Sequence, residues 1–188
     1  MQTNLQTERL TLRPYQPSDA QALRVLADNF KVARMLTRLP HPYPEGEAER
    51  WIGTHDDLRA AGTGYPFAVE KDGALLGTIA IERGDCGAFE LGYWLTESAW
   101  GQGLATEAAR GILGFAFDEL GLAYVRSRYI ADNGASARVL TKVGFLGTGR
   151  ARTFHAVRQA EVEMIHLILL RDAFIRDDSG TKQVYKAA

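Results

Sequence analysis

A predicted strand, a turn with two glycines and a predicted helix follow one another over residues 89–115, and this unit constrains the fold more than any other segment. Alternation predicts a strand over Phe89–Leu95, and apolar side chains recur at helical spacing from Leu104 onward. Gly101 and Gly103, one residue apart, let the backbone approach a ligand closely. The free N–H groups and dipole of the next helix attract anions. The unit therefore predicts a phosphate-binding turn, with a purely structural connection as the alternative.

The spacing argues against two other phosphate-binding motifs. A P-loop ends in Gly-Lys-Ser/Thr, which this turn lacks. The dinucleotide fingerprint requires a third glycine three residues after Gly103, and Thr106 stands there. A dinucleotide-binding oxidoreductase is therefore the weaker hypothesis, which a titration with NAD would test. A pyrophosphate held by backbone N–H groups is the favoured ligand.

The rest of the chain predicts a single mixed α/β domain around one central sheet. Predicted strands cover residues 10–12, 67–69, 75–81, 89–95, 124–130, 145–148 and 162–170. Predicted helices cover residues 20–28, 44–58 and 135–143, and another begins at Leu104 and is closed by Gly121. Asp72-Gly73 predicts a hairpin turn. We expect the domain to span residues 1–176, followed by a loosely ordered polar tail over residues 177–188.

Composition excludes several classes of protein. The formal net charge of -1 provides no global basic field for nucleic acid or an anionic membrane. The single cysteine, Cys86, cannot form an internal disulfide or a metal cluster. Residues 1–13 show no signal-peptide core, and no apolar run approaches the roughly 18 residues of a membrane span. We expect a cytoplasmic protein without a metal, and the sequence leaves open whether it forms a homodimer.

Two segments resemble signatures of the GNAT superfamily of N-acetyltransferases. Gly101-Gln102-Gly103-Leu104-Ala105-Thr106-Glu107-Ala108 is similar to the family's acetyl-CoA loop, although Ser98 stands where the family has Gln or Arg. With Trp100 before it, the loop resembles the branch of RimJ and RimL, which acetylate protein N-termini. Asn133-Gly134-Ala135-Ser136, followed by Lys142-Val143-Gly144-Phe145, resembles the second signature. Residues 7–14 and 42–52 are similar to the family's first strand and acceptor-side helices.

The resemblance implies a GNAT fold whose mostly antiparallel sheet splays between residues 89–95 and 124–130. It also implies an acyltransferase that moves an acetyl group from acetyl-CoA to a primary amine by direct attack in a ternary complex. The acceptor would be a protein N-terminus or a small-molecule amine. The alternative is a non-catalytic acyl-CoA-binding or sensory module. The implied acetyl-CoA contacts are Tyr93, Trp94, Leu95, Gly101, Gln102, Gly103, Leu104, Ala105, Thr106, Asn133 and Ser136.

Two residues are candidates for catalysis. The resemblance implies that Ser136 assists the departing thiolate, whereas a serine in a first helical turn can also satisfy a backbone donor. Glu90, on the strand beside the implied pantetheine, could accept the amine proton directly or through water. Its alternative is a solvated or paired strand residue. Asn133 suits a helix cap, and Tyr93 could supply a hydroxyl or fill the core.

Other residues leave their roles open. Glu163, Glu161 and His155 come late in the chain, where members of the resembled family often bring a residue to the acceptor. Arg138 and Lys142 share a helical face, which is either solvated or near the phosphates of the adenosine end.

Tyr43 and Trp51 predict an aromatic wall for the acceptor. His166, inside an apolar strand, is expected to be a core histidine.

Overall fold

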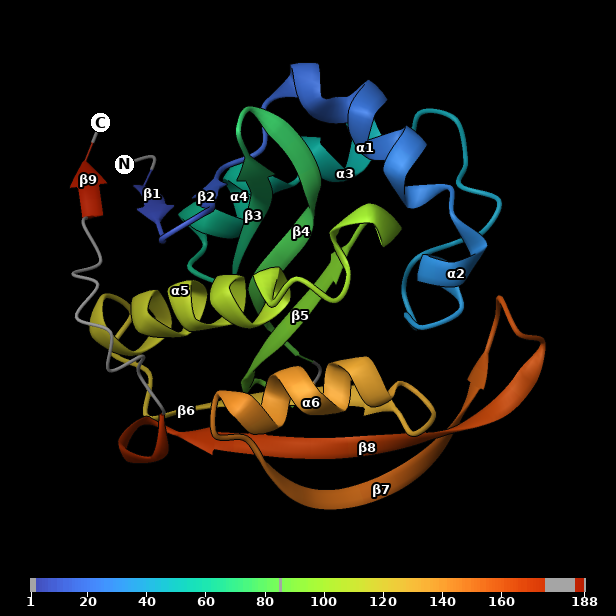
Figure 1. The fold of residues 1–188 in the computed structure, drawn as a ribbon, viewed down its shortest axis with the longest axis vertical. Coiled ribbons are helices and arrows are strands. Elements are labelled where there is room, and N and C mark those ends of the chain that lie inside the picture. The colour runs from blue at the N-terminus through green and yellow to red at the C-terminus, as the bar shows by residue number, and fades with distance from the viewer. Residues whose placement is uncertain (1–2, 85, 175–184, 188) are drawn as a thin grey trace.

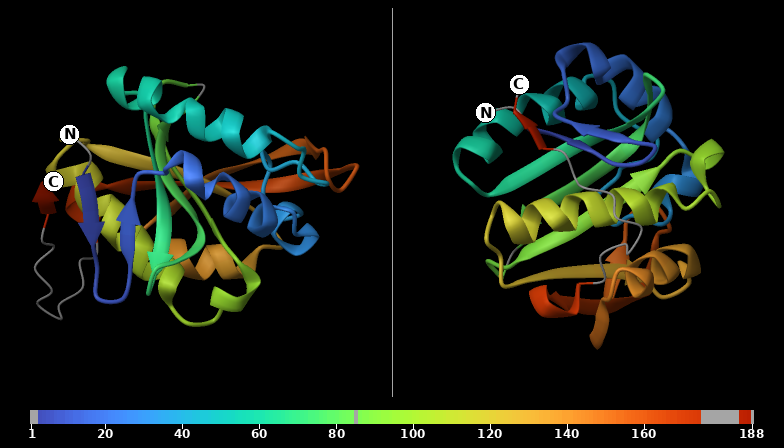
Figure 2. Two further views of the ribbon diagram at one scale, coloured as in Figure 1. Left: turned by 90° about the horizontal axis from the view of Figure 1, so that it is seen from above. Right: turned by 60° about the vertical axis from the view of Figure 1, so that its left-hand side comes forward.

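The computed structural model describes residues 3–84, 86–174 and 185–187 of the chain. Its strands form one sheet in the order β7-β8-β6-β5-β4-β3-β2-β1-β9, with helices on both faces (Figures 1 and 2). The strands are β1 (Thr3–Gln6), β2 (Thr11–Arg13), β3 (Gly64–Lys71), β4 (Ala74–Arg83), β5 (Phe89–Leu95), β6 (Tyr124–Ile130), β7 (Leu146–His155), β8 (Ala160–Leu170) and β9 (Tyr185–Ala187). The helices are η1 (Pro17–Asp19), α1 (Ala20–Ala27), α2 (Phe30–Ala33), α3 (Glu47–Gly53), α4 (His55–Ala60), η2 (Glu97–Ala99), α5 (Leu104–Asp118), α6 (Gly134–Lys142) and η3 (Arg171–Ala173).

Among the described strands, one neighbouring pair is parallel, β5–β6, and the sheet splits there, as predicted. These strands pair only at Glu90↔Arg126 and Leu91↔Ser127, and they diverge beyond that point (Figure 1). The Ser127 hydroxyl donates to the Leu91 carbonyl at 2.9 Å, close to the point of divergence. All other neighbouring strands pair antiparallel. The splay exposes the β6-facing edge of β5.

The two faces of β4 and β5 pack against different helices. Ile79 and Leu91 belong to the main apolar core, which includes the buried stripe of α5. Trp94, on the opposite face, packs on a second cluster built by α1 and α3. This separation follows from the alternation of side chains along a strand. The gap between β5 and β6 therefore joins the two faces of the sheet. One is the face covered by α5 and α6, here called the α5–α6 side, and the other is the face covered by α1 and α3, here called the α1–α3 side.

Several boundaries differ from the sequence prediction. The helix predicted over residues 44–58 is two helices, and the Thr54 hydroxyl donates to the Trp51 carbonyl at 2.7 Å where α3 ends. Strand β7 extends to His155, and its exposed positions from Leu146 to Phe154 show no apolar periodicity from which it could be predicted. Of the predicted tail, residues 177–184 and 188 lie outside the described residues, and Tyr185–Ala187 pair with β1.

Among the residues that the structure describes, no helix combines the length and the apolarity needed to cross a bilayer.

His55 begins α4 as a buried histidine between two aromatic rings. Its ring centroid lies 4.2 Å from that of Trp51 and 5.5 Å from that of Tyr15. Within the described residues neither ring nitrogen has a hydrogen-bond partner. Burial, aided by the nearby positive charge of Arg59, lowers the pKa of His55 to about 4. His55 is therefore neutral in the folded protein at neutral pH.

This burial predicts a pH-dependent loss of stability. Unfolded, His55 takes up a proton near pH 6.5, whereas folded it does so only near pH 4. Its contribution is therefore complete above pH 6.5, falls as the pH drops to 4, and changes little below that. The total loss should be roughly 3 kcal/mol. Urea unfolding of wild type and His55→Phe at pH 7.5 and 4.5 measures it. The variant should lose less stability on acidification, and an equal loss in both proteins contradicts the assignment.

Candidate active site

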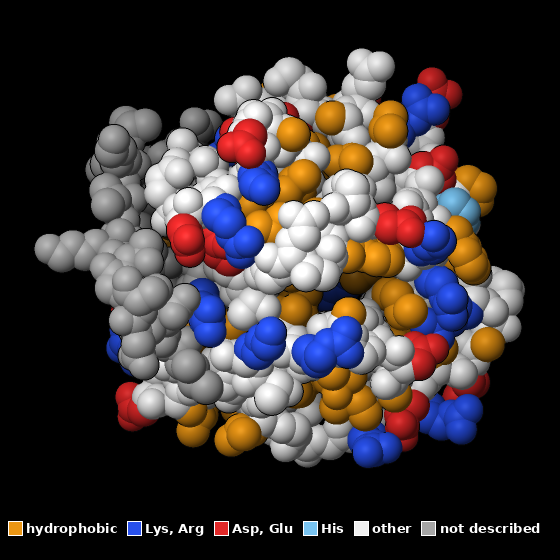
Figure 3. All heavy atoms as spheres, viewed as in Figure 1, with side chains coloured by type: hydrophobic (Ala, Val, Ile, Leu, Met, Phe, Trp, Pro, Cys, Tyr) orange, Lys and Arg blue, Asp and Glu red, His pale blue; other side chains and the backbone are white. Residues whose placement is uncertain are grey.

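A cavity of about 950 Å³ lies at the splay between β5 and β6. Figure 3 shows a hollow near the centre of one face, with hydrophobic side chains inside it and Lys and Arg side chains around it. One wall contains the start of α5 and the face of α6, and the other contains residues 34–40, Thr78, Ala80 and Glu82. The cavity therefore has walls from both sides of the sheet.

The predicted phosphate-binding turn lines this cavity. Gly101 and Gly103 have φ values of 74° and 78°, in the left-handed region that favours glycine. Gly103 is also the N-cap of α5, and it carries no side chain that could cap the first helical N–H groups. A Cβ built on Gly101 meets no atom within 4 Å, which shows open space in front of the turn. Open backbone at a helix N-terminus fits a pyrophosphate.

Hydrogen bonds that join Thr7, Arg9 and Glu107 to one another and to the Gln102 carbonyl, here called the brace, hold this turn in place. The sequence did not predict them. Glu107 accepts hydrogen bonds from the Thr7 hydroxyl at 2.6 Å, the Arg9 backbone N–H at 2.6 Å and Arg9 Nε at 2.7 Å. Arg9 Nη1 also donates to the Gln102 carbonyl at 3.0 Å. Burial opposes ionisation of Glu107, but the hydrogen bonds from Thr7 and Arg9 lower its pKa overall. The brace ties the turn to the β1–β2 connection.

The residues predicted to contact acetyl-CoA all line the cavity except Gln102. The Gln102 side chain instead donates to the Ser98 carbonyl at 2.7 Å. The side chain of Trp94 packs on the α1–α3 side of the sheet. Arg138 and Lys142 also line the cavity, which favours their placement near a phosphate over a purely solvated face.

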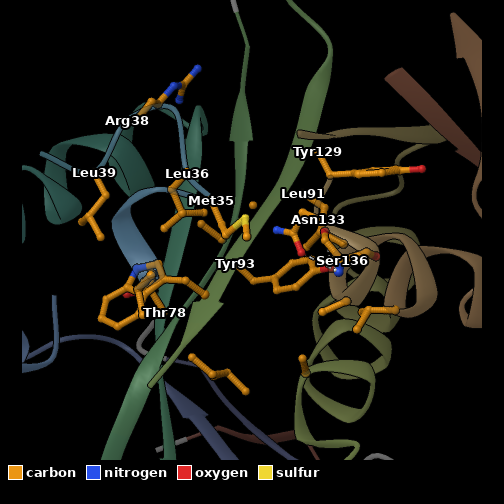
Figure 4. Close-up of a pocket in the computed structure, with 18 of the residues that line it drawn as sticks. Met35, Leu36, Arg38, Leu39, Thr78, Leu91, Tyr93, Tyr129, Asn133 and Ser136 are labelled. Carbon is orange, nitrogen blue, oxygen red and sulfur yellow. Dashed lines mark hydrogen bonds between the residues drawn. The ribbon is translucent and has the colours of Figure 1, made fainter. Parts of the chain in front are cut away.

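Ser136 and Tyr93 meet at the α6 side of the cavity (Figure 4). The Tyr93 hydroxyl lies 2.9 Å from Ser136 Oγ. Asn133 Oδ1 accepts from the Ser136 backbone N–H at 3.1 Å, so Asn133 provides the cap of α6. Burial raises the pKa of Tyr93, which keeps its hydroxyl protonated. Asn133 therefore provides the side-chain cap of α6, whereas the Ser136 hydroxyl contacts Tyr93, and a catalytic role for Ser136 stays a prediction.

Two carboxylates face the other side of the cavity. Glu90 on β5 lies in register with Glu82 on β4, so both side chains project from the same face of the sheet. Arg128 Nε lies 3.7 Å from Glu90 Oε2, and Arg38 Nη1 lies 3.7 Å from Glu82 Oε2. Burial raises the pKa of Glu82 against the opposing effect of Arg38. Sequence reasoning missed Glu82, since only strand register places it opposite Glu90.

Three candidate acceptor-side residues from the C-terminal part of the chain lie outside the cavity. Glu163 and Glu161 form exposed ion pairs with Arg150 and Arg152, and neither carboxylate lines the cavity. His155 is buried near the tip of the β7–β8 hairpin and does not line the cavity either.

The predicted aromatic wall and the predicted core histidine have different outcomes. Tyr43 and Trp51 line the cavity on its α1–α3 side. Burial raises the pKa of Tyr43 to about 12, so its hydroxyl stays neutral. His166 is only partly buried and lines a smaller cavity with Glu90 and Arg126, so its prediction as a core residue was wrong.

In the described part of the chain, no group of three His, Cys, Asp or Glu side chains could hold a metal ion.

The comparisons with known proteins agree with this geometry. The acetyltransferase (GNAT) domain pattern matches residues 9–146. A putative ribosomal N-acetyltransferase, YdaF of Bacillus subtilis (strain 168), is 28% identical over 87% of this chain and 92% of its own. The crystal structure of a probable acetyltransferase is 28% identical with a TM-score of 0.77, covering 88% of this chain and 94% of its own.

The fold is also shared with RimL, a ribosomal alpha-N-protein acetyltransferase solved in complex with coenzyme A. Its TM-score is 0.79 at 19% identity, covering 89% of this chain and 97% of that protein. The pattern match covers most of the sequence and includes the glycine turn, β5 and all of α6. This chain therefore belongs to the GNAT acetyltransferase family, the acetyl-CoA-dependent enzymes that transfer an acetyl group to an amine.

Proposed function

We propose that this enzyme acetylates the α-amine of a protein or peptide N-terminus. The observation that carries the proposal is the two-sided cavity at the splay. One side holds the Ser136–Tyr93 hydroxyl pair beside the glycine turn, and the other holds Glu90 and Glu82. A thioester and an amine that enter from opposite sides of the sheet can meet there without sharing one entrance.

The cofactor side suits acetyl-CoA in three places. The turn at Gly101 and Gly103 would hold the pyrophosphate through backbone N–H groups. The β6-facing edge of β5 beyond Leu91 has no paired strand within the described residues, so it can bind an extended pantetheine as a strand would. Arg138 and Lys142 would lie near the adenosine phosphates. Acetyl-CoA supplies the activated acetyl group.

The protein's own groups then have defined tasks. The amine nitrogen forms a bond to the thioester carbonyl carbon, and the carbon–sulfur bond breaks. If Tyr93 donates its hydrogen bond to Ser136 Oγ, the Ser136 proton is free to move to the departing thiolate, and Ser136 then regains a proton from water while Glu90 releases the amine proton to water. Glu90 takes the proton that the amine loses, directly or through a water. No covalent bond to the enzyme is required.

The preference for an α-amine rests on charge state and on relatives. An α-amine has a reference pKa near 8 and a lysine amine near 10.4. A larger fraction of α-amine is therefore neutral and able to attack near pH 7. YdaF is named as a putative ribosomal N-acetyltransferase, and RimL as an alpha-N-protein acetyltransferase. A small-molecule amine is the alternative acceptor.

A panel of amines with acetyl-CoA tests the proposal. It should contain peptides that begin with serine or alanine, N-terminally blocked peptides with one lysine, and spermidine. Mass spectrometry of the products and release of free CoA thiol measure transfer. We expect the free-N-terminus peptides to gain one acetyl group. Transfer only to spermidine would replace the acceptor assignment, and CoA binding without transfer to any amine would favour a non-catalytic module.

Replacing Glu90 with glutamine should depress the rate most at low pH. Glutamine keeps the size of the side chain but cannot take the amine proton. The defect should be smaller on an α-amine peptide than on a lysine peptide, because the α-amine is less protonated. pH–rate profiles of wild type and Glu90→Gln with both peptides measure this effect.

Glu82→Gln is the matched control, since Glu82 faces the same cavity from the neighbouring strand. If Glu82→Gln alone changes the shape of the profile, Glu82 is the base. If both variants give profiles parallel to wild type at every pH, neither carboxylate relays the proton.

A further inference from the structure

The tip of the β7–β8 hairpin reaches past the sheet to the segment that covers the α1–α3 side of the cavity. Figure 1 shows the hairpin curving up toward α2 at one side of the molecule, and Figure 2 shows the same approach from above. Arg158 lies in the turn between the two strands. Only 15% of its side chain is exposed, although it belongs to a hairpin turn.

One guanidinium group joins two separate segments. Arg158 Nη1 and Nη2 donate to Asp132 Oδ2 and Oδ1 at 2.7 and 3.0 Å, which is a two-pronged pair with one carboxylate. Arg158 Nε donates to the Arg34 carbonyl at 2.7 Å, and Nη2 lies 3.2 Å from Met35 Sδ. Arginine suits this contact because its planar guanidinium presents several N–H donors in fixed directions, here called the fork. The ammonium group of lysine cannot reproduce this arrangement.

The two segments belong to the two sides of the cavity. Residues 34–40, here called the acceptor loop, line the side opposite α6, and Figure 4 shows Met35 and Leu36 across the cavity from Ser136. Asp132 immediately precedes Asn133, which caps α6 and binds the Ser136 backbone. Arg158 therefore connects the acceptor loop with the segment that caps α6, the helix that carries Ser136.

The position of Arg158 is itself held by a buried residue. The Arg158 backbone N–H donates to His155 Nδ1 at 3.1 Å, and only 2% of His155 is exposed. Its partner Asp132 has a pKa lowered chiefly by the hydrogen bond from Arg158, so the pair is ionised at neutral pH. The contact is thus built from a fixed turn, a shielded guanidinium and a charged partner.

We propose that Arg158 is a positioning residue for acceptor binding: it holds the acceptor loop against the α6 side of the cavity. Its role in acceptor binding rests on the proposed function, whereas its hold on the loop does not. Without Arg158 the loop should sample open positions, so an acceptor should bind more weakly. The glycine turn that would bind the pyrophosphate has its own brace at Arg9 and Glu107, so CoA affinity should change little.

Hydrogen exchange of the full chain tests the hold on the loop without any acceptor. Amides of residues 34–39 should exchange about tenfold faster in Arg158→Ala than in wild type. Arg158→Lys should give an intermediate rate, since lysine keeps a charge near Asp132 but lacks the fork. Arg152→Ala is the matched control, because Arg152 lies in the same hairpin and pairs with exposed Glu161. Unchanged exchange in the loop, or an equal rise across the whole chain, overturns the proposal.

Kinetics and binding then test the consequence for the acceptor. With a peptide that begins with serine or alanine, Arg158→Ala should raise the peptide KM about tenfold, because small losses of position have large effects. The Kd for CoA should change by less than about twofold. Equal losses in both would mean that Arg158 supports the whole site and would overturn a selective role. If the loop opens but wild type acetylates no peptide, the proposed acceptor is wrong and the hold on the loop stands.

Discussion

Replacing Ser136 with alanine is expected to lower turnover by about 10- to 10⁴-fold, the range for loss of a positioned proton donor. The Michaelis constant for acetyl-CoA should change much less. The reason is geometric, because the Ser136 hydroxyl contacts the Tyr93 hydroxyl at 2.9 Å and takes no part in capping α6. Steady-state kinetics with a peptide acceptor, together with a melting curve, measure the two effects separately.

Asn133→Ala is the matched control for this variant. Asn133 caps the same helix, so its loss should cost about 1 kcal/mol of stability. Ser136→Ala should leave the melting temperature nearly unchanged. Tyr93→Phe should reduce turnover in the same direction, since it removes the hydrogen bond to Ser136 Oγ. If Ser136→Ala melts like Asn133→Ala and turns over like wild type, the hydroxyl has no catalytic role.

Replacing Gly103 with valine is expected to weaken acetyl-CoA binding at least tenfold, or about 1.4 kcal/mol. Valine disfavours the φ of 78° found here, and its branched side chain would stand where the phosphate should meet the backbone. A Cβ at this position also lies 3.6 Å from Arg9 Nη2, which belongs to the brace behind the turn. Isothermal titration with CoA measures the loss.

Gly73→Val separates backbone strain from the loss of a binding surface. Gly73 also has a φ of 78°, has open space around its Cβ position and lies in the β3–β4 hairpin turn. Its variant should lose stability by a similar mechanism and bind CoA as wild type does. If Gly103→Val folds and keeps wild-type CoA affinity, the turn is only a structural connection.

Membership of the family and competence for catalysis are separate questions. A module that kept the turn at Gly101 and Gly103 could bind CoA and transfer nothing. Such a module would not need the hydroxyl pair of Ser136 and Tyr93 or the carboxylate of Glu90, which this cavity contains. Acetyl transfer to an amine, and its loss in Ser136→Ala, therefore discriminates between the two readings.

The sequence by itself determined the features that depend on neighbouring residues. The strand, the two glycines and the helix of residues 89–115 were predicted because strand alternation, positive φ and helical spacing are local properties. The cap of α6 was predicted from Asn133 for the same reason. The splay after Leu91 was not derivable from these patterns, and its prediction came from the resemblance to a known family.

Only the tertiary structure decided which side chains meet. Arg9 and Glu107 are 98 positions apart, and the contact of Arg158 with Arg34 spans 124. Such pairs depend on strand register and on how loops fold back, which no local pattern encodes. Local chemistry assigned the cap of α6 to Asn133, but it gave no partner for the Ser136 hydroxyl. The fold supplies that partner by placing the Tyr93 hydroxyl 2.9 Å from Ser136 Oγ.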